Sequence, residues 1–285
     1  MVEWETAIGR IASVCAIDGY ENIISIWAYS RLRQYAQSGM TEQIKDEFLL
    51  EQVRQEYFPE CVFRLTGLYF FDSIDNVKLA IDRWGLPKER FKQLATVNFT
   101  ANNLTHVDSE WVTHCLGKSG KNDKWMYSYW KGETYGQRPL TEVLASGWGL
   151  VEETERREEC YKSVFKKWPK STLLLALGAT SFNCVVMGLD ENCQSVSQII
   201  PHLFFRDGKV SGNYAMNKGF GLKDTSKKNW IQICTSKGWN FPIHPAAKPS
   251  SSNPGQVTLP DFKGHFELEI KDPEIANFLL KQRSL

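Results

Sequence analysis

Two short stretches, Val62-Phe-Arg-Leu-Thr-Gly67 and Pro139-Leu-Thr-Glu-Val-Leu-Ala145, frame the part of the chain that decides the fold. Apolar and β-branched residues dominate both stretches, a composition that favours strands. Successive side chains of a strand point to opposite faces, so Arg64 is expected to project away from its apolar neighbours. Glu142 also lies between apolar residues. We therefore expect a sheet that presents one cation and one carboxylate.

The residues between these stretches predict a mixture of helices and strands. Asp72 and Ser73 are typical of a helix start, and the apolar residues that follow recur at helical spacing until Gly85. Residues 94–100 predict a second strand, and the alternation in Trp125-Met-Tyr-Ser-Tyr-Trp130 predicts a third. Such a mixture is typical of an α+β protein.

Both flanks of this region carry helical patterns. Residues 4–57 predict helices, and Thr41 is typical of an N-cap for the third of them. The charged run that begins at Glu152 predicts an exposed helix that ends before Pro169. We therefore predict an α+β fold in three parts. These parts are an N-terminal helical segment 1–59, a core 60–168, and a basic C-terminal region 169–285 that forms either a second domain or an extension of the core.

The net charge of +1 hides an asymmetry along the chain. Residues 1–159 carry a balance of −6, and residues 160–285 carry a balance of +7. Lysines interleaved with aromatic rings suit a nucleic-acid backbone with stacked bases. A solvated basic surface would give the same pattern, and so would attraction between two oppositely charged halves. The residues concerned are Lys166, Lys167, Lys170, Lys223, Lys227, Lys228, Trp168, Phe220, Trp230 and Trp239.

Cysteine content and apolar runs predict the cellular setting. The chain has seven cysteines and no CxxC pair, which favours free thiols in a reducing compartment, the cytoplasm. Its His and Cys spacings match no familiar metal pattern, so no metal site is expected. We see neither a signal peptide nor an apolar run of the roughly 18 residues that a membrane span needs. No membrane contact is therefore expected.

Four features of the core region have both a functional and a structural interpretation. Arg64 is suited to a pyrophosphate or carboxylate ligand, or to a structural salt bridge. Glu142 is costly to desolvate unless it has a use, or it faces water at a sheet edge. The aromatic rings of Trp125–Trp130 suit a planar ligand or core packing. The polar run from Asn98 to Asp108 suits a cleft or turns.

Together these residues resemble the core of ADP-ribosyltransferases. In that superfamily the first core strand carries an Arg or His and a helix follows, as in Val62-Phe-Arg-Leu-Thr-Gly67 and the helix that ends at Trp84-Gly-Leu-Pro87. A late strand carries the catalytic Glu. Pro139-Leu-Thr-Glu-Val-Leu-Ala145 is similar to it, especially to the toxin and phage-defence branches that modify DNA or RNA. The resemblance covers about residues 60–152.

The resemblance implies a split β-sheet core that binds NAD as a substrate. It implies that Glu142 is catalytic, because this carboxylate would hydrogen-bond the ribose and stabilise the positive sugar as the nicotinamide bond breaks. Arg64 would hold the NAD phosphates or the adjoining ribose. The implied NAD-binding set is Arg64, Thr66, Asn98, Tyr127, Tyr129 and Trp130. No Gly-rich phosphate loop is required, and the sequence contains none.

The implied function is transfer of ADP-ribose to RNA or DNA by a toxin or an anti-phage defence effector. Two alternatives stay open. One is a nucleic-acid-binding protein without catalysis, and the other is a nuclease or other hydrolase that uses His106 and Asp108, with Glu110 and His114 nearby. A toxin-like module would also have a partner protein, such as an antitoxin or a chaperone. Dependence on NAD separates the transferase from both alternatives.

Overall fold

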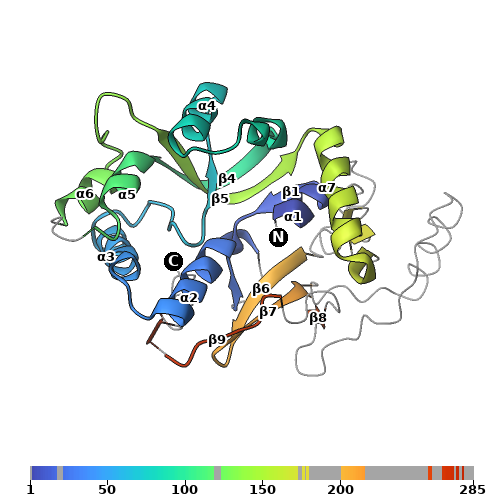
Figure 1. Ribbon diagram of the computed structural model, residues 1–285. Helices are drawn as coiled ribbons and strands as arrows, with labels where there is room; N and C mark the ends of the chain where they lie inside the picture. The colour runs from blue at the N-terminus through green and yellow to red at the C-terminus, as the bar shows by residue number, and fades with distance from the viewer. Residues whose placement is uncertain are drawn as a thin grey trace, which may run out of the picture. The chain divides into compact units, whose positions relative to one another are not determined.

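The computed structural model divides the chain into two compact units, and most of their helices and strands are labelled in Figure 1. One unit comprises Met1–Ile11 and Val151–Glu267, and the other comprises Ala12–Leu150 and Leu268–Leu285. The sequence predicts parts that meet at 59/60 and 168/169, whereas the chain passes between the units at 11/12, 150/151 and 267/268. The residues described are 2–17, 22–118, 123–172, 175–176, 178–179, 200–215, 256–258, 265–272, 274–275 and 278.

Helices make up much of the unit Ala12–Leu150 and Leu268–Leu285. Ser25, Thr41 and Ser73 begin three of these helices, because each side-chain oxygen accepts a hydrogen bond from the backbone N–H three residues later. The helices are α2 (Ile26–Ser38), α3 (Glu42–Tyr57), α4 (Ile74–Arg83), α5 (Ser109–Cys115) and α6 (Lys124–Trp130), with 3-10 turns η1 (Val14–Ala16) and η2 (Lys88–Gln93).

The long strand β5 is the centre of this unit's sheet, with β3 and β4 paired to it. β3 runs antiparallel to β5, with Leu68 opposite Ala145. β4 crosses β5 closely: a Cβ atom at Gly147 would lie 2.2 Å from the Thr100 carbonyl oxygen, so only glycine fits there. The strands are β2 (Ile23–Ile24), β3 (Leu68–Phe70), β4 (Val97–Asp108), β5 (Thr141–Val151) and β9 (Leu268–Glu269).

The hydrophobic core of this unit forms around α6. Trp125, Met126, Tyr129 and Trp130 are all buried, and this spacing places them on one face of a helix. α6 contacts α3, α5 and β4. The other buried members of the core are Leu50 of α3, Val62, Val107 of β4, Cys115 of α5 and Leu144 of β5.

The unit Met1–Ile11 and Val151–Glu267 combines a helix pair with a hairpin. Trp4 of α1 and Val164 of α7 are buried, and the two helices pack together. Asp207 and Gly208 form the hairpin turn, with φ of 50° and 74°, the left-handed conformation that such two-residue turns require. The elements are α1 (Val2–Ile8), β1 (Arg10–Ala12), α7 (Thr154–Lys167), η3 (Pro169–Ser171), β6 (Ile200–Arg206), β7 (Lys209–Ala215) and β8 (Gln256–Thr258).

Several sequence predictions about the fold are confirmed. The chain mixes helices with antiparallel sheets, as the predicted α+β class requires. Thr41 caps α3, and Ser73 caps α4. Gly85 follows the end of α4 with a φ of 60°, the left-handed conformation common after helix ends. The charged run after Glu152 forms α7.

Two predicted strands are wrong. Trp125–Trp130 forms helix α6, because these residues fit the helical period as well as an alternation, and the helix packs against α3 and α5. Arg64 lies in a turn, since the backbone N–H groups of Thr66 and Gly67 both donate to the carbonyl of Phe63. The strand that follows, β3, is only three residues long. The first of the two framing stretches therefore bends the chain before the sheet begins.

One further expectation is corrected by the extent of the strands. The polar run from Asn98 to Asp108 lies within strand β4. These residues are therefore extended and do not form turns. Residues 141–151 form one continuous strand, which contains most of the second framing stretch.

Part of the basic C-terminal half lies outside the described residues. Lys223, Lys227, Lys228, Phe220, Trp230 and Trp239 belong to this part, as do Cys184, Cys193 and Cys234. A nucleic-acid surface there stays a prediction. The four described cysteines are free thiols: Cys15 is exposed, Cys61 is half-buried, and Cys115 and Cys160 are buried.

Candidate functional site

Arg64 is buried in the turn before β3, and its guanidinium contacts two other side chains. Its Nη1 donates a 2.6 Å hydrogen bond to the Tyr129 hydroxyl of α6, and its Nε donates to the Glu47 carboxylate of α3 at 3.3 Å. Among the described residues, none accepts a hydrogen bond from Nη2. Two of the three guanidinium nitrogens are therefore committed to the fold, while Nη2 keeps donors that no described residue occupies.

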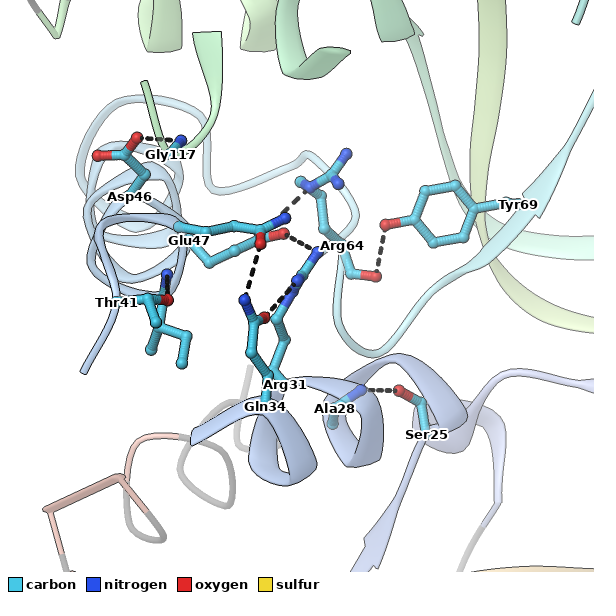
Figure 2. A network of polar contacts seen from close by, with 12 residues as sticks. Ser25, Ala28, Arg31, Gln34, Thr41, Asp46, Glu47, Arg64, Tyr69 and Gly117 are labelled. Atoms are coloured by element: carbon cyan, nitrogen blue, oxygen red, sulfur yellow. Dashed lines mark hydrogen bonds and ion pairs between the residues drawn. The ribbon is translucent and has the colours of Figure 1, made fainter. Parts of the chain in front are cut away.

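Glu47 lies between two guanidinium groups, as Figure 2 shows. Its second oxygen is 3.4 Å from Nη2 of Arg31 on α2, and Arg31 also donates to Gln34 at 2.8 Å. The carboxylate is almost fully buried, and a buried charge is costly unless it is paired. The two cations provide that compensation. α2, α3 and the Arg64 turn are thus joined by one buried ionic network.

Two tyrosine rings border the Arg64 guanidinium. Its central carbon lies 5.4 Å from the ring centre of Tyr129 and 5.7 Å from that of Tyr69. At these distances each ring attracts the cation through its π face. The Tyr69 hydroxyl also donates to the Arg64 carbonyl at 2.9 Å (Figure 2), so β3 fixes the backbone of the turn. Both the main chain and the side chain of Arg64 are therefore held in place.

Glu142 is the buried carboxylate of β5, with only 8% of the residue exposed. Within the part of the chain that the structure describes, no group donates a hydrogen bond to this carboxylate. Burial raises the pKa of Glu142 to about 7, while the positive charge of Arg64 lowers it and the negative charge of Asp108 raises it. A carboxyl group whose pKa lies near 7, under the influence of a cation and with no hydrogen-bond donor among the described residues, can exchange a proton at physiological pH.

Asp108 has a structural role at the end of β4. Its carboxylate accepts hydrogen bonds from the backbone N–H groups of Glu110, Tyr135 and Leu140, at 3.1, 2.9 and 3.0 Å. It therefore caps α5 and ties the loop before β5 to the end of β4. Because three donors occupy its oxygens, Asp108 is poorly placed for the acid–base role that the hydrolase alternative requires. His106 is exposed on β4.

The remaining predicted NAD-binding residues lie in different surroundings. Thr66 is buried, and its hydroxyl donates to the Phe63 carbonyl at 3.3 Å. Trp130 packs edge-on against Tyr129, and its indole N–H donates to the Leu50 carbonyl. The structure therefore brings Arg64, Tyr129 and Glu142 into one electrostatically coupled group, with Thr66 in the same turn as Arg64.

Tyr127 and Asn98 do not join this group in the structure. Tyr127 packs against the rings of Tyr57 and Phe58, with ring centres 5.1 and 6.3 Å apart. Asn98 is exposed on β4. A role for either residue in binding NAD stays a prediction, since within the described residues no hydrogen bond or ring contact links them to Arg64 or Glu142.

Sequence reasoning missed Glu47, Arg31 and Tyr69. A signal for Glu47 was present, because residues 44, 47, 51 and 54 share the buried face of α3 and three of these four positions are charged. Charged side chains at core-facing positions of a helix need partners in the fold. The sequence indicates that Arg64 needs an anionic partner. It does not identify Glu47 as that partner, because the two residues are 17 positions apart and no local pattern connects them.

A second polar group lies on the surface of α5. Glu110 binds Nε2 of His114 at 3.1 Å and Arg83 of α4 at 3.3 Å. The imidazole stacks almost parallel on the Tyr135 ring, with ring centres 4.8 Å apart. A carboxylate that orients an exposed imidazole is one arrangement for general base catalysis. It is also a common way to hold a surface helix.

Comparison with known proteins identifies no relative of this chain. No protein-family model matches it, and no curated protein and no solved structure is significantly similar. Within the described residues, no three His, Cys, Asp or Glu side chains are grouped so as to hold a metal ion. None of the described helices is long and apolar enough to cross a membrane.

Proposed function

We propose that this protein is an NAD-dependent mono-ADP-ribosyltransferase that modifies a nucleic acid, as a toxin or an anti-phage defence effector. The observation that carries the proposal is the buried carboxyl group of Glu142, which has no hydrogen-bond donor among the described residues and is electrostatically coupled to Arg64 and Tyr129. The proposal includes an ADP-ribosyltransferase-like sheet core, with β5 as the strand that carries the catalytic residue.

The chemistry of the group supports this reaction. When the nicotinamide–ribose bond breaks, positive charge develops on the ribose, and an ionised Glu142 would stabilise it. A pKa of about 7 also lets Glu142 take a proton from the attacking acceptor group. The Nη2 donors of Arg64, which have no acceptor among the described residues, suit the NAD pyrophosphate, which a forked guanidinium binds well. Burial of the group in a low-dielectric setting would strengthen both interactions.

Nicotinamide release from NAD tests the proposal most directly. We expect the wild-type protein to release nicotinamide and Glu142→Gln to lose at least about a hundredfold in rate, in line with removal of a principal transition-state stabiliser. Arg64→Lys should weaken NAD binding, because a lysine cannot replace the forked donor. Glu133→Gln is the matched control, since Glu133 is half-exposed and lies outside the Arg64–Glu142 group.

Full activity in Glu142→Gln would contradict the assignment of the catalytic residue. Absence of NAD turnover in the wild-type protein with any nucleic acid would contradict the proposed function itself. Covalent labelling of RNA or DNA by a radiolabelled adenylate from NAD would identify the acceptor class. A co-purifying antitoxin or chaperone would support the proposed toxin role.

A hydrolase is the second candidate function, and the Glu110–His114 pair is the observation that favours it. It predicts activity on nucleic acid without NAD and loss of that activity in His114→Ala. In contrast, the transferase proposal predicts that His114→Ala leaves NAD turnover unchanged. If the protein shows neither activity, a non-catalytic nucleic-acid-binding protein is the remaining alternative.

A further inference from the structure

The stretch from Trp84 to Leu94 is exposed at every position. It follows α4 and includes the 3-10 turn η2 (Lys88–Gln93), which contacts α4. Four large apolar side chains have 38–41% of their surface exposed, far more than core residues. These side chains are Trp84, Leu86, Phe91 and Leu94. An ordered stretch with so many uncovered apolar groups is typical of an interaction surface.

Positive charges are interleaved with these apolar side chains. The stretch contains three basic residues, Lys88, Arg90 and Lys92, and one acidic residue, Glu89. Within the described residues, neither Lys88 nor Lys92 forms an ion pair. The neighbouring cations on α4 differ, because Lys78 pairs with Asp75 and Arg83 pairs with Glu110. The stretch therefore keeps its positive charge available for a partner, and that partner should be anionic.

We propose that the stretch 84–94 binds a single-stranded nucleic acid. Exposed Trp and Phe rings stack on bases, which a duplex keeps covered, and adjacent cations bind the phosphates. The chain continues from Leu94 into β4, where Asn98, Thr100 and Asn102 are exposed and uncharged. Such polar groups suit base and sugar edges, whereas they oppose insertion into a bilayer.

This surface adds a docking site for the acceptor to the proposed function, and it rests on that function only for the role of the bound strand. Its residues are separate from Arg64, Tyr129 and Glu142. Binding can be measured without NAD, so loss of binding and loss of turnover are independent results. A bound but unmodified strand would contradict the transferase and leave the docking surface intact.

Fluorescence anisotropy with a labelled single-stranded RNA of about 16 nucleotides tests the proposal on the full chain. The variant K88Q/R90Q/K92Q should bind at least about tenfold more weakly. Its plot of log affinity against log salt should be shallower by about 2 units, since each phosphate contact on a single strand contributes about 0.7. The control K45Q/K131Q/K162Q removes the same charge from exposed ion pairs elsewhere and should retain wild-type affinity.

The apolar half of the surface needs a separate variant. Trp84→Ala and Phe91→Ala should each weaken binding about tenfold and leave the salt slope unchanged, because stacking releases no counterions. Both residues are exposed, so circular dichroism should show an intact fold. Equal losses in the two triple variants would overturn the proposal. Equal affinity for duplex RNA, or binding only to vesicles with anionic lipids, would overturn it as well.

Discussion

The carboxyl group of Glu142 links the candidate site to the stability of the fold. Burial raises its pKa from 4.5 to about 7. Below pH 4.5 it is protonated in both the folded and the unfolded chain, so it adds no pH dependence. Between these values the unfolded chain loses the proton and the folded chain keeps it, so stability falls as pH rises. Above about pH 7 the carboxyl group is ionised in both states, and its contribution to stability no longer changes with pH.

Glu142→Gln should therefore stabilise the protein at neutral and alkaline pH. The variant lacks the buried charge, so its free energy of unfolding should exceed that of wild type by up to about 3 kcal/mol near pH 8, and should match it near pH 4. Urea unfolding at both pH values measures this difference. A variant that is less stable than wild type at alkaline pH would show that the ionised carboxylate has a structural partner.

The hydroxyl of Tyr129 supports a different prediction at the same site. It accepts the 2.6 Å hydrogen bond from buried Arg64, so Tyr129→Phe leaves a buried donor without an acceptor. We expect a loss of about 1–3 kcal/mol in urea unfolding. Tyr135→Phe is the control, because the Tyr135 hydroxyl has no hydrogen bond to a described residue, and its loss should be small. Similar losses in both variants would contradict the role given to the Arg64–Tyr129 bond.

Elements with strong local signals were predictable from the sequence, and α4 is the clearest case. Ser73 begins it, the apolar residues follow the helical period, and Gly85 lies just beyond its end. α6 was not predictable in this way, because six residues with four aromatic rings suit both periods. Its helical state depends on packing against α3 and α5, which no local pattern encodes.

The candidate site was predictable only in part, because local signals reveal single residues but not their distant contacts. Arg64 and Glu142 stand out locally, as charged residues among apolar ones. Their coupling through Tyr129 depends on α6, which was predicted as a strand, and on Glu47 of α3. The turn at Arg64 depends on another distant contact, since the backbone N–H of Val62 donates to the Thr105 side chain of β4. Long-range contacts of this kind leave no periodic trace in the sequence.

Asp108 should be the most sensitive capping residue in the described part of the chain. Its carboxylate serves three backbone donors at the junction of β4, α5 and β5. Asp108→Ala leaves these donors unsatisfied, and we expect a loss of about 2–4 kcal/mol in urea unfolding. Ser73→Ala, which removes the exposed cap of α4, is the control and should cost about 1 kcal/mol. An Asp108→Ala loss no larger than this control would contradict the junction role.

At the scale of the whole molecule, each unit is assembled from segments that are distant in sequence. The first 11 residues belong with residues 151–267, and the last 18 belong with residues 12–150. Sequence patterns divide a chain into consecutive parts, and so they predicted boundaries at 59/60 and 168/169. α1 illustrates the difference, because it packs against α7 and β6, which lie far along the chain but in the same unit.

Two matched tryptophan variants test whether the units are independent in stability. Trp4 is 1% exposed in one unit and Trp130 is 3% exposed in the other, so each substitution by alanine should cost about 3–5 kcal/mol within its own unit. In hydrogen exchange, Trp4→Ala should speed amide exchange in α1, α7 and β6, and leave α3, α5 and α6 near wild-type rates. Trp130→Ala should give the reverse pattern. Trp4 and Trp130 belong to different units, so local opening should follow the unit that lost packing. Equal acceleration throughout the chain in both variants would show a single cooperative fold.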